Sequence, residues 1–287
     1  MEIVHPLCCG LDIHKRSIQA CLVSTDAAGR AQRTPRQFGT MTSDILALAA
    51  WLREAGCPLV AMESTGVYWK PIWNLLEEHF SLLLVNAAHL KRVPGRKSDV
   101  QESQWLLKLH TYGLLRNSFH PPADIRVVRT YWRQRGDHVH AVSTCIQRMQ
   151  KVLTQMNIQL ANVISDLSGW TGQRIVRAIL AGERDPDTLA ALSHPGIHAT
   201  RQTISKSLEG TWQPDLVFVL QQEVATYDAC QQRIAACDQA LEQHLQHLAT
   251  KAGAPATPHA PKRRRKAGSH APQFDLRGEL TGSAAST

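Results

Sequence analysis

The hydrophobic pattern of this chain changes its period near residue 128, and this change divides any fold that it can adopt into two parts. After that point apolar side chains alternate steps of four and three, the spacing of a heptad seam, over about forty residues. The members of this seam are Val128, Trp132, Arg135, Val139, Val142, Ile146, Met149, Leu153, Met156, Leu160, Val163 and Leu167. A straight helix of that length would be a rod of roughly 60 Å. We therefore expect it to pair with another helix or to project from the rest of the chain.

A second seam follows farther along the chain, and its members are Val217, Leu220, Val224, Tyr227, Ile234, Leu241, Leu245 and Leu248. Two polar side chains, Gln231 and Asp238, occupy seam positions, and we expect them to fix the register of the helices. Between the two seams, residues 171–192 predict a shorter helical piece around Pro186. Residues 121–250 are therefore interpreted as an all-α helical, coiled-coil region.

The positive charge of the chain is concentrated near its end. Residues 251–287 hold seven basic and two acidic residues, including the run from Lys262 to Lys266, while residues 1–250 carry a net charge of only +3. This basic tail contains few large apolar side chains, so we expect residues 251–287 to be disordered. Because the rest of the chain is only mildly basic, a nucleic-acid partner has to be argued from local patches.

The first 120 residues carry short apolar or alternating runs, which are typical of β-strands, separated by helical patterns. The expected strands are 7–13, 17–24, a third near 34–40, then 58–62 and 81–85, and the expected helices run from Ser43 to Gly56, over 67–79, and from Ser98. Three antiparallel strands followed by α-β-α-β-α is the order of the RNase H-like, or RuvC-like, α/β fold. We predict that fold for residues 1–120.

The cysteine content and the N-terminus point to the cellular compartment. The seven cysteines are scattered without a C-x-x-C pair, which favours neither a disulfide framework nor a zinc knuckle. The N-terminus lacks the basic start and apolar core of a signal peptide, and no stretch approaches ~18 apolar residues. We expect a cytoplasmic protein that does not interact with membranes.

Four acidic residues are candidates for chemistry. Asp12 lies within an apolar strand, where alternation places it on the face opposite Leu11 and Ile13, and a carboxylate there is costly unless it is paired or bound to metal. Glu63 ends the fourth predicted strand. Asp99 and Glu102 lie three residues apart, so both point to one face of the predicted third helix.

Each of these acids also has a purely structural interpretation. Asp12 alone also fits a charge near a solvated strand end, and Glu63 alone fits an acid at a helix entry. Ser98 and Gln101 form a capping box, and acids such as Asp99 are favoured in a first helical turn without any function. The four are more specific together, because the first strand, the fourth strand and the last helix converge in an RNase H-like fold.

Clustered carboxylates repel one another unless divalent cations lie between them. The four acids therefore predict a catalytic site with Mg²⁺, which activates a nucleophile and stabilises the leaving oxygen in phosphodiester chemistry. Four basic residues precede Asp99 and are candidates for binding nucleic-acid phosphates, the alternative being a solvated charged loop. They are Lys91, Arg92, Arg96 and Lys97.

Three motifs occur in order and at suitable spacing around these acids. They are Gly10-Leu11-Asp12-Ile13-His14-Lys15, Glu63-Ser64-Thr65-Gly66-Val67-Tyr68 and Gly95-Arg96-Lys97-Ser98-Asp99-Val100. The chain resembles the transposases of the insertion-sequence 110 and 1111 group, which are related to the pilin-gene invertases. The resemblance covers about residues 7–250 and is firmest over the first 115 residues.

The resemblance implies a DNA transposase with an acidic tetrad, of which Asp12, Glu63 and Asp99 would be three members. It also implies DNA partners, namely element ends and target, together with a structured guide RNA. From the seams we expect a homo-oligomer formed through the helical region. The fourth tetrad position, usually Asp in the family, is Glu102 here, one methylene longer.

The family also has a C-terminal domain with a catalytic serine, for which we find no counterpart. We assign no nucleophile to Ser269, Ser283 or Ser286, and we expect this chain by itself to bind nucleic acid without completing strand exchange. One alternative is a non-catalytic nucleic-acid-binding or regulatory remnant of a transposase. A second is an actin-like sugar kinase, which would need a Gly-rich phosphate-binding turn that is not found after Asp12.

Overall fold

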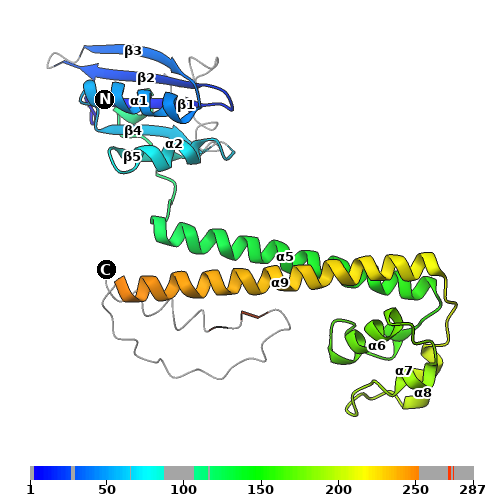
Figure 1. The fold of residues 1–287 in the computed structure, drawn as a ribbon. Coiled ribbons are helices and arrows are strands. Elements are labelled where there is room, and N and C mark those ends of the chain that lie inside the picture. Colours follow the sequence, from blue (N-terminus) through cyan, green and yellow to red (C-terminus); the bar gives the residue numbers. More distant parts are fainter. Residues whose placement is uncertain are drawn as a thin grey trace. The chain divides into compact units, whose positions relative to one another are not determined.

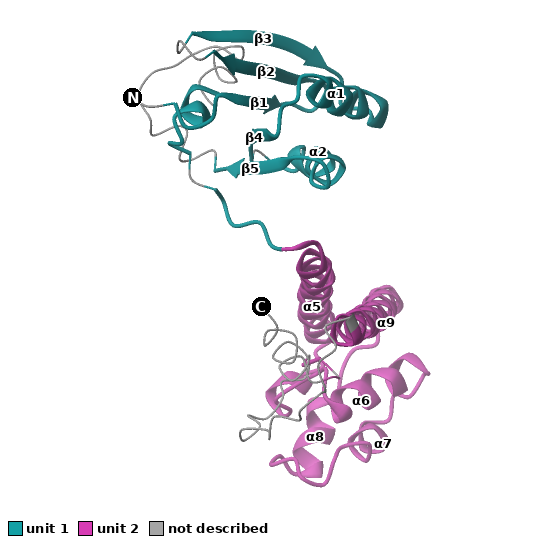
Figure 2. Ribbon diagram, turned by 90° about the vertical axis from the view of Figure 1, so that its left-hand side faces the viewer, with its two compact units in different colours: residues 1–121 teal, residues 122–287 magenta. Residues whose placement is uncertain are grey.

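The structure is a computed structural model with two compact units, residues 1–121 and residues 122–287 (Figure 2), each described separately below. The residues that it describes are 3–26, 30–64, 66–86, 107–115, 117–251, 271–272 and 274. The predicted helix start at Ser98 lies outside these ranges, as does almost all of the predicted disordered tail.

The first unit is built on a five-stranded sheet (Figure 1). Its strands are β1 (Leu7–Ile13), β2 (Ile18–Thr25), β3 (Ala31–Phe38), β4 (Leu59–Glu63) and β5 (Ser81–Val85). The spatial order is β3-β2-β1-β4-β5; β1, β2 and β3 pair antiparallel, while β4 runs parallel to both β1 and β5. This is the strand order of the RNase H-like fold, so the predicted fold class is confirmed.

One face of the sheet is covered by α1 (Thr42–Glu54) and α2 (Trp69–Leu76). Ile45, Leu48 and Leu52 recur at helical spacing on α1, and all three are buried against the sheet. Leu11 and Met62, which pair across β1 and β4, belong to the same core. Burial of these apolar side chains is the main force that holds the two helices on the sheet.

The opposite face of the sheet carries a smaller apolar cover. Cys8 and Val23 pack there against Leu107, which begins a helical turn over residues 107–111. Beside them, Ala61 and Val85 pack with the partly buried Leu115. Because successive side chains of a strand point to opposite faces, this face holds the even-numbered residues of β1.

The second unit contains two long helices, α5 (Ala123–Gln155) and α9 (Pro214–Lys251), which lie side by side (Figure 1). The α5 seam therefore pairs with another helix within the same chain. Its polar interruption is explained by Arg135, whose Nε and Nη2 donate to the two carboxylate oxygens of Asp238 on α9. The second polar position, Gln231, donates to the Tyr227 hydroxyl at 3.0 Å.

The prediction of one continuous helix through Leu167 was wrong, because α5 ends at Gln155. Asn157 takes a left-handed conformation with φ of 57° and donates its N–H to Thr154, while Ile158 donates to Leu153, both at 2.9 Å. This is a Schellman motif, in which asparagine substitutes for the more usual glycine. Of the later seam members, Leu160 begins the short helix that follows, whereas Val163 and Leu167 lie in turns; Leu160 and Leu167 are buried in the core of this unit, and Val163 is partly buried.

These short elements lie at the end of the helical pair where α5 ends and α9 begins (Figure 1). They are η1 (Leu160–Asn162), α6 (Trp170–Leu180), α7 (Pro186–Ala190) and α8 (Arg201–Ser207). The single piece predicted for 171–192 is two helices, because Gly182 turns the chain with φ of 102° and Asp185 caps a new helix that has Pro186 in its first turn. Among the helices that the structure describes, none has the length and apolar character needed to span a membrane.

Candidate acidic site

Asp12 lies near the carboxyl end of β1, paired across the antiparallel ladder with Gln19. Its neighbours Leu11 and Ile13 belong to the core under α1 and α2, so the Asp12 side chain points to the opposite face, as the alternation predicted. The residue is only 8% exposed. A carboxylate held this far from water needs partners that stabilise its charge.

His14 provides one such partner for Asp12. Its Nε2 lies 3.0 Å from Asp12 Oδ2, and the imidazole is about half exposed, with 45% of its side-chain surface accessible. His14 follows β1 directly, since the strand ends at Ile13, and the two side chains are in contact two residues apart. The sequence analysis gave His14 no role, although the Asp12-x-His14 spacing was a usable signal for this contact.

Glu63 is the last residue of β4, the strand next to β1. Leu11 pairs with Met62 in the parallel ladder, so Asp12 and Glu63 are the next residues on neighbouring strands. Such strands are about 4.8 Å apart, and matching positions in a parallel ladder face the same side. The fold therefore brings two of the four predicted acids together on one face of the sheet, at the carboxyl ends of β1 and β4.

Two carboxylates on adjacent strands, one of them buried, repel each other unless a proton or a cation lies between them. Oxygen ligands of this type suit a divalent cation such as Mg²⁺, which completes its shell with further carboxylates, waters or phosphate oxygens. Within the described part of the chain, no group of three or more His, Cys, Asp and Glu side chains is arranged to hold a metal ion.

The other predicted site residues lie outside the described residues. This holds for the acids Asp99 and Glu102, and for the basic residues Lys91, Arg92, Arg96 and Lys97. The part of the site that the structure describes thus consists of Asp12, Glu63 and His14. It lies on the face of the sheet that also carries the helical turn over 107–111.

A family model described as a transposase, of the DEDD and IS110 type, matches residues 9–158 of the chain, which is more than half of its length. The chain belongs to this transposase family. The matched segment includes β1 from Cys9 onward, the other four strands of the sheet and the whole of α5, so the resemblance predicted from the three motifs is confirmed.

Two solved structures are weakly similar to this chain, and the names of both mention a Holliday junction. The fowlpox virus Holliday junction resolvase is 12% identical and matches 38% of this chain and 99% of its own, with a TM-score of 0.29. The T. thermophilus RuvC protein in complex with a Holliday junction substrate is 9% identical and matches 39% of this chain and 99% of its own, with a TM-score of 0.30. A search of curated proteins gives no match.

Proposed function

We propose that this transposase-family protein carries out metal-dependent phosphodiester chemistry on DNA, at an acidic site that includes Asp12 and Glu63. The observation that carries the proposal is their position as matching residues at the ends of two neighbouring parallel strands, on one face of an RNase H-like sheet. Membership of the transposase family supports DNA as the substrate class.

The site residues present fit a divalent cation, because carboxylate oxygens are its preferred ligands. In the proposal Asp12 and Glu63 hold Mg²⁺ from the two strands, and Asp99 and Glu102 supply further carboxylates from the later motif. When bound, the ion polarises the phosphodiester and stabilises the charge that develops during its cleavage. His14, at hydrogen-bond distance from Asp12, orients that carboxylate.

Further partners belong to the same proposal. Lys91, Arg92, Arg96 and Lys97 would bind phosphates near the acids, and a structured guide RNA would select the DNA, as the family resemblance implies. We also propose self-association through the helical region. Phe218 and Val219, at the start of α9, are 59% and 39% exposed and supply apolar surface for it. Light scattering on a Phe218→Asp variant tests this part, because a charge there opposes association.

The proposed chemistry is tested with the purified chain, DNA carrying the element ends and the element RNA, in Mg²⁺, in Ca²⁺ and in EDTA. We expect Mg²⁺-dependent DNA binding or strand cleavage that is lost in Asp12→Asn and Glu63→Gln. Glu54→Gln, which changes an exposed acid at the end of α1, is the matched control and should behave as wild type. Metal-independent binding that is the same in all variants would instead support a non-catalytic nucleic-acid-binding role.

A further inference from the structure

The second unit carries an exposed tryptophan whose position is fixed by its neighbours. Trp170, the first residue of α6 (Figure 1), is 55% exposed. The central carbon of the Arg174 guanidinium lies 4.2 Å from the centroid of its ring, and the His194 ring meets it in a T-shaped arrangement, with ring centroids 5.8 Å apart. Arg174 and His194 are also exposed. These three side chains form one surface cluster, which we call the Trp170 platform.

Hydrogen bonds and close packing hold the platform in place. The His194 N–H donates to the Thr171 hydroxyl, and the Gly196 N–H donates to His194 Nδ1, both at 3.0 Å. Because Nδ1 accepts this bond, the neutral imidazole carries its proton on Nε2, which is a donor. The first turn of α6 lies so close to the loop before it that a side chain on Gly172 would collide with the Leu167 carbonyl. A surface that is ordered in this way loses little conformational entropy when it binds a ligand.

The platform carries a positive charge that the described residues do not neutralise. Arg174 makes no hydrogen bond or ion pair within the described structure, whereas Arg177, one turn farther along α6, pairs with Asp228. The acidic residue in the loop before α6, Asp166, accepts hydrogen bonds from the N–H and the hydroxyl of Ser168, at 2.8 and 2.6 Å. An arginine that stacks on an aromatic face keeps its N–H donors at the edge of the stack. The platform therefore combines a stacking surface with donors for an anion.

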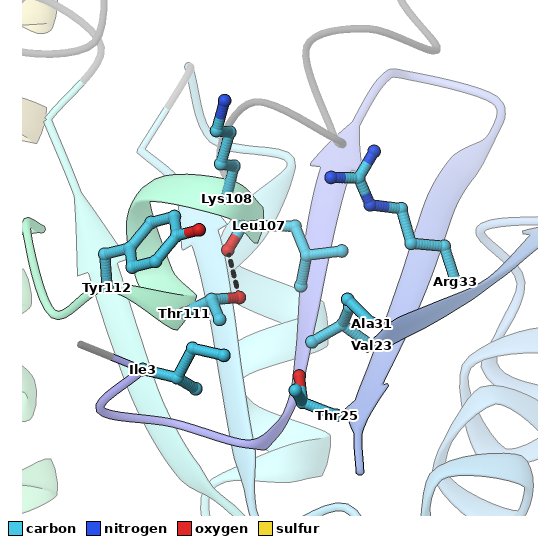
Figure 3. Close-up of a pocket in the computed structure, with 9 residues that line it drawn as sticks. All are labelled: Ile3, Val23, Thr25, Ala31, Arg33, Leu107, Lys108, Thr111 and Tyr112. Carbon is cyan, nitrogen blue, oxygen red and sulfur yellow. Dashed lines mark hydrogen bonds between the residues drawn. The ribbon is translucent and has the colours of Figure 1, made fainter. Parts of the chain in front are cut away.

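A small pocket of about 80 Å³ on the first unit does not have this convergence. Figure 3 shows the Thr25 hydroxyl at the end of the pocket opposite the Arg33 and Lys108 head groups. The Thr111 hydroxyl in its lining donates to the Leu107 carbonyl at 2.9 Å. The polar groups of the pocket therefore do not meet at one ligand, whereas those of the Trp170 platform contact one ring.

An aromatic ring stacked with a guanidinium is a surface on which unpaired bases stack in single-stranded nucleic acids. We propose that the Trp170 platform binds one unpaired nucleotide of a single strand, RNA or DNA, an inference that rests on the proposed function for its choice of nucleic acid. The base extends the stack of indole and guanidinium, and Arg174 donates to the phosphate of the same nucleotide. An apolar protein surface in the same place would remove water from the Arg174 charge without providing a counterion. Because a base within a duplex is already stacked on both faces, the platform selects single strands.

Binding is measured with the full chain in EDTA, by fluorescence anisotropy of labelled oligo(U), oligo(dU) and a fully paired DNA duplex, so that it does not depend on metal chemistry. We expect Trp170→Leu to weaken single-strand binding by about fivefold or more and to leave duplex binding unchanged, because only the single strands offer an unstacked base. Trp170→Phe retains an aromatic face and should lose less affinity than Trp170→Leu. The affinity for oligo(U) relative to oligo(dU) identifies RNA or DNA as the source of the strand, since the two differ in the 2′-hydroxyl.

The chain offers a matched control for each side chain. Trp132→Leu removes a tryptophan that is 42% exposed and whose ring centroid lies 5.6 Å from the guanidinium of Arg135, which is buried and paired with Asp238. Arg174→Gln should lower the slope of log affinity against log salt for the single strands by about 0.7, the value for one phosphate. Arg177→Gln removes the same charge from the same helix, and neither control should change single-strand binding. Circular dichroism of each variant verifies that the fold is retained.

Equal single-strand affinity in wild type and Trp170→Leu would overturn the platform assignment and leave the proposed function intact. A Trp170→Leu variant that dissociates an oligomer in light scattering, with unchanged single-strand affinity, would show that the platform contacts protein, and would also overturn it. Absence of both single-strand binding and Mg²⁺-dependent DNA binding or cleavage by the wild-type chain would contradict the proposed function itself, and the platform assignment with it.

Discussion

The buried pair Arg135–Asp238 is the interaction between α5 and α9 whose disruption should cost most. The two side chains retain only 6% and 7% of their exposed surface, and two N–H groups of the guanidinium donate to the carboxylate. Asp238→Asn keeps the shape of the side chain but leaves the Arg135 charge buried without its counterion. Removing one partner of such a pair costs about 3–5 kcal/mol.

Urea unfolding followed by the helical circular dichroism signal measures this loss. With a slope of about 2–3 kcal/mol per molar urea, the unfolding midpoint of Asp238→Asn should fall by about 1–2 M. The double variant Arg135→Met with Asp238→Leu removes both charges and should recover most of the loss, because apolar replacements of a buried pair are often neutral or stabilising.

Asp228→Asn is the matched control. Asp228 pairs with Arg177 of α6, but these side chains are 40% and 48% exposed, and surface pairs contribute only about 0–1 kcal/mol. If Asp238→Asn shifts the midpoint no more than Asp228→Asn does, the buried pair does not hold the two helices together, and the reasoning from burial is refuted.

Two further predictions concern other parts of the chain. Burial, and secondarily the nearby His5, lowers the pKa of His110 from 6.5 to about 4. Between these two pH values the unfolded chain binds more protons than the folded chain. The free energy of unfolding should therefore decrease as the pH drops from about 6.5 towards 4. In thermal melts across this pH range, the melting temperature of His110→Phe should depend less on pH than that of wild type. An unchanged pH dependence would contradict the assignment of this effect to His110. At the end of α5, Asn157→Val should cost about 1–2 kcal/mol because it forces a branched side chain into the left-handed region, whereas Asn157→Gly should be tolerated; equal melting temperatures would exclude the strain.

Most of the sheet was predictable because its strands carry clear apolar patterns. The bounds of β1 and β5 agree with the predicted strands, since both combine short apolar runs with well-marked ends. The third strand was placed three residues late. Every residue of β3 except Phe38 is exposed, so that edge strand has almost no hydrophobic signal.

The helical region shows where local pattern is insufficient. The heptad spacing correctly identified Val142 and Met149 as buried, but it continued smoothly past Asn157, where backbone conformation ends the helix. Likewise, alternation predicted the face on which Asp12 lies, while its proximity to Glu63 required the parallel pairing of β1 with β4. That pairing joins residues about fifty positions apart, and only the recognised fold order implied it.

The most direct test of the acidic site is Mn²⁺ binding followed by electron paramagnetic resonance, because bound Mn²⁺ loses the signal of the free ion and no DNA or RNA is needed. If Asp12 and Glu63 hold a divalent cation, wild type and Glu54→Gln should bind Mn²⁺ with the same affinity, and Mg²⁺ should compete with this binding. Asp12→Asn and Glu63→Gln should bind Mn²⁺ at least tenfold more weakly, a loss of about 1.4 kcal/mol or more in binding free energy. Equal Mn²⁺ affinity in wild type and in both site variants would contradict the account.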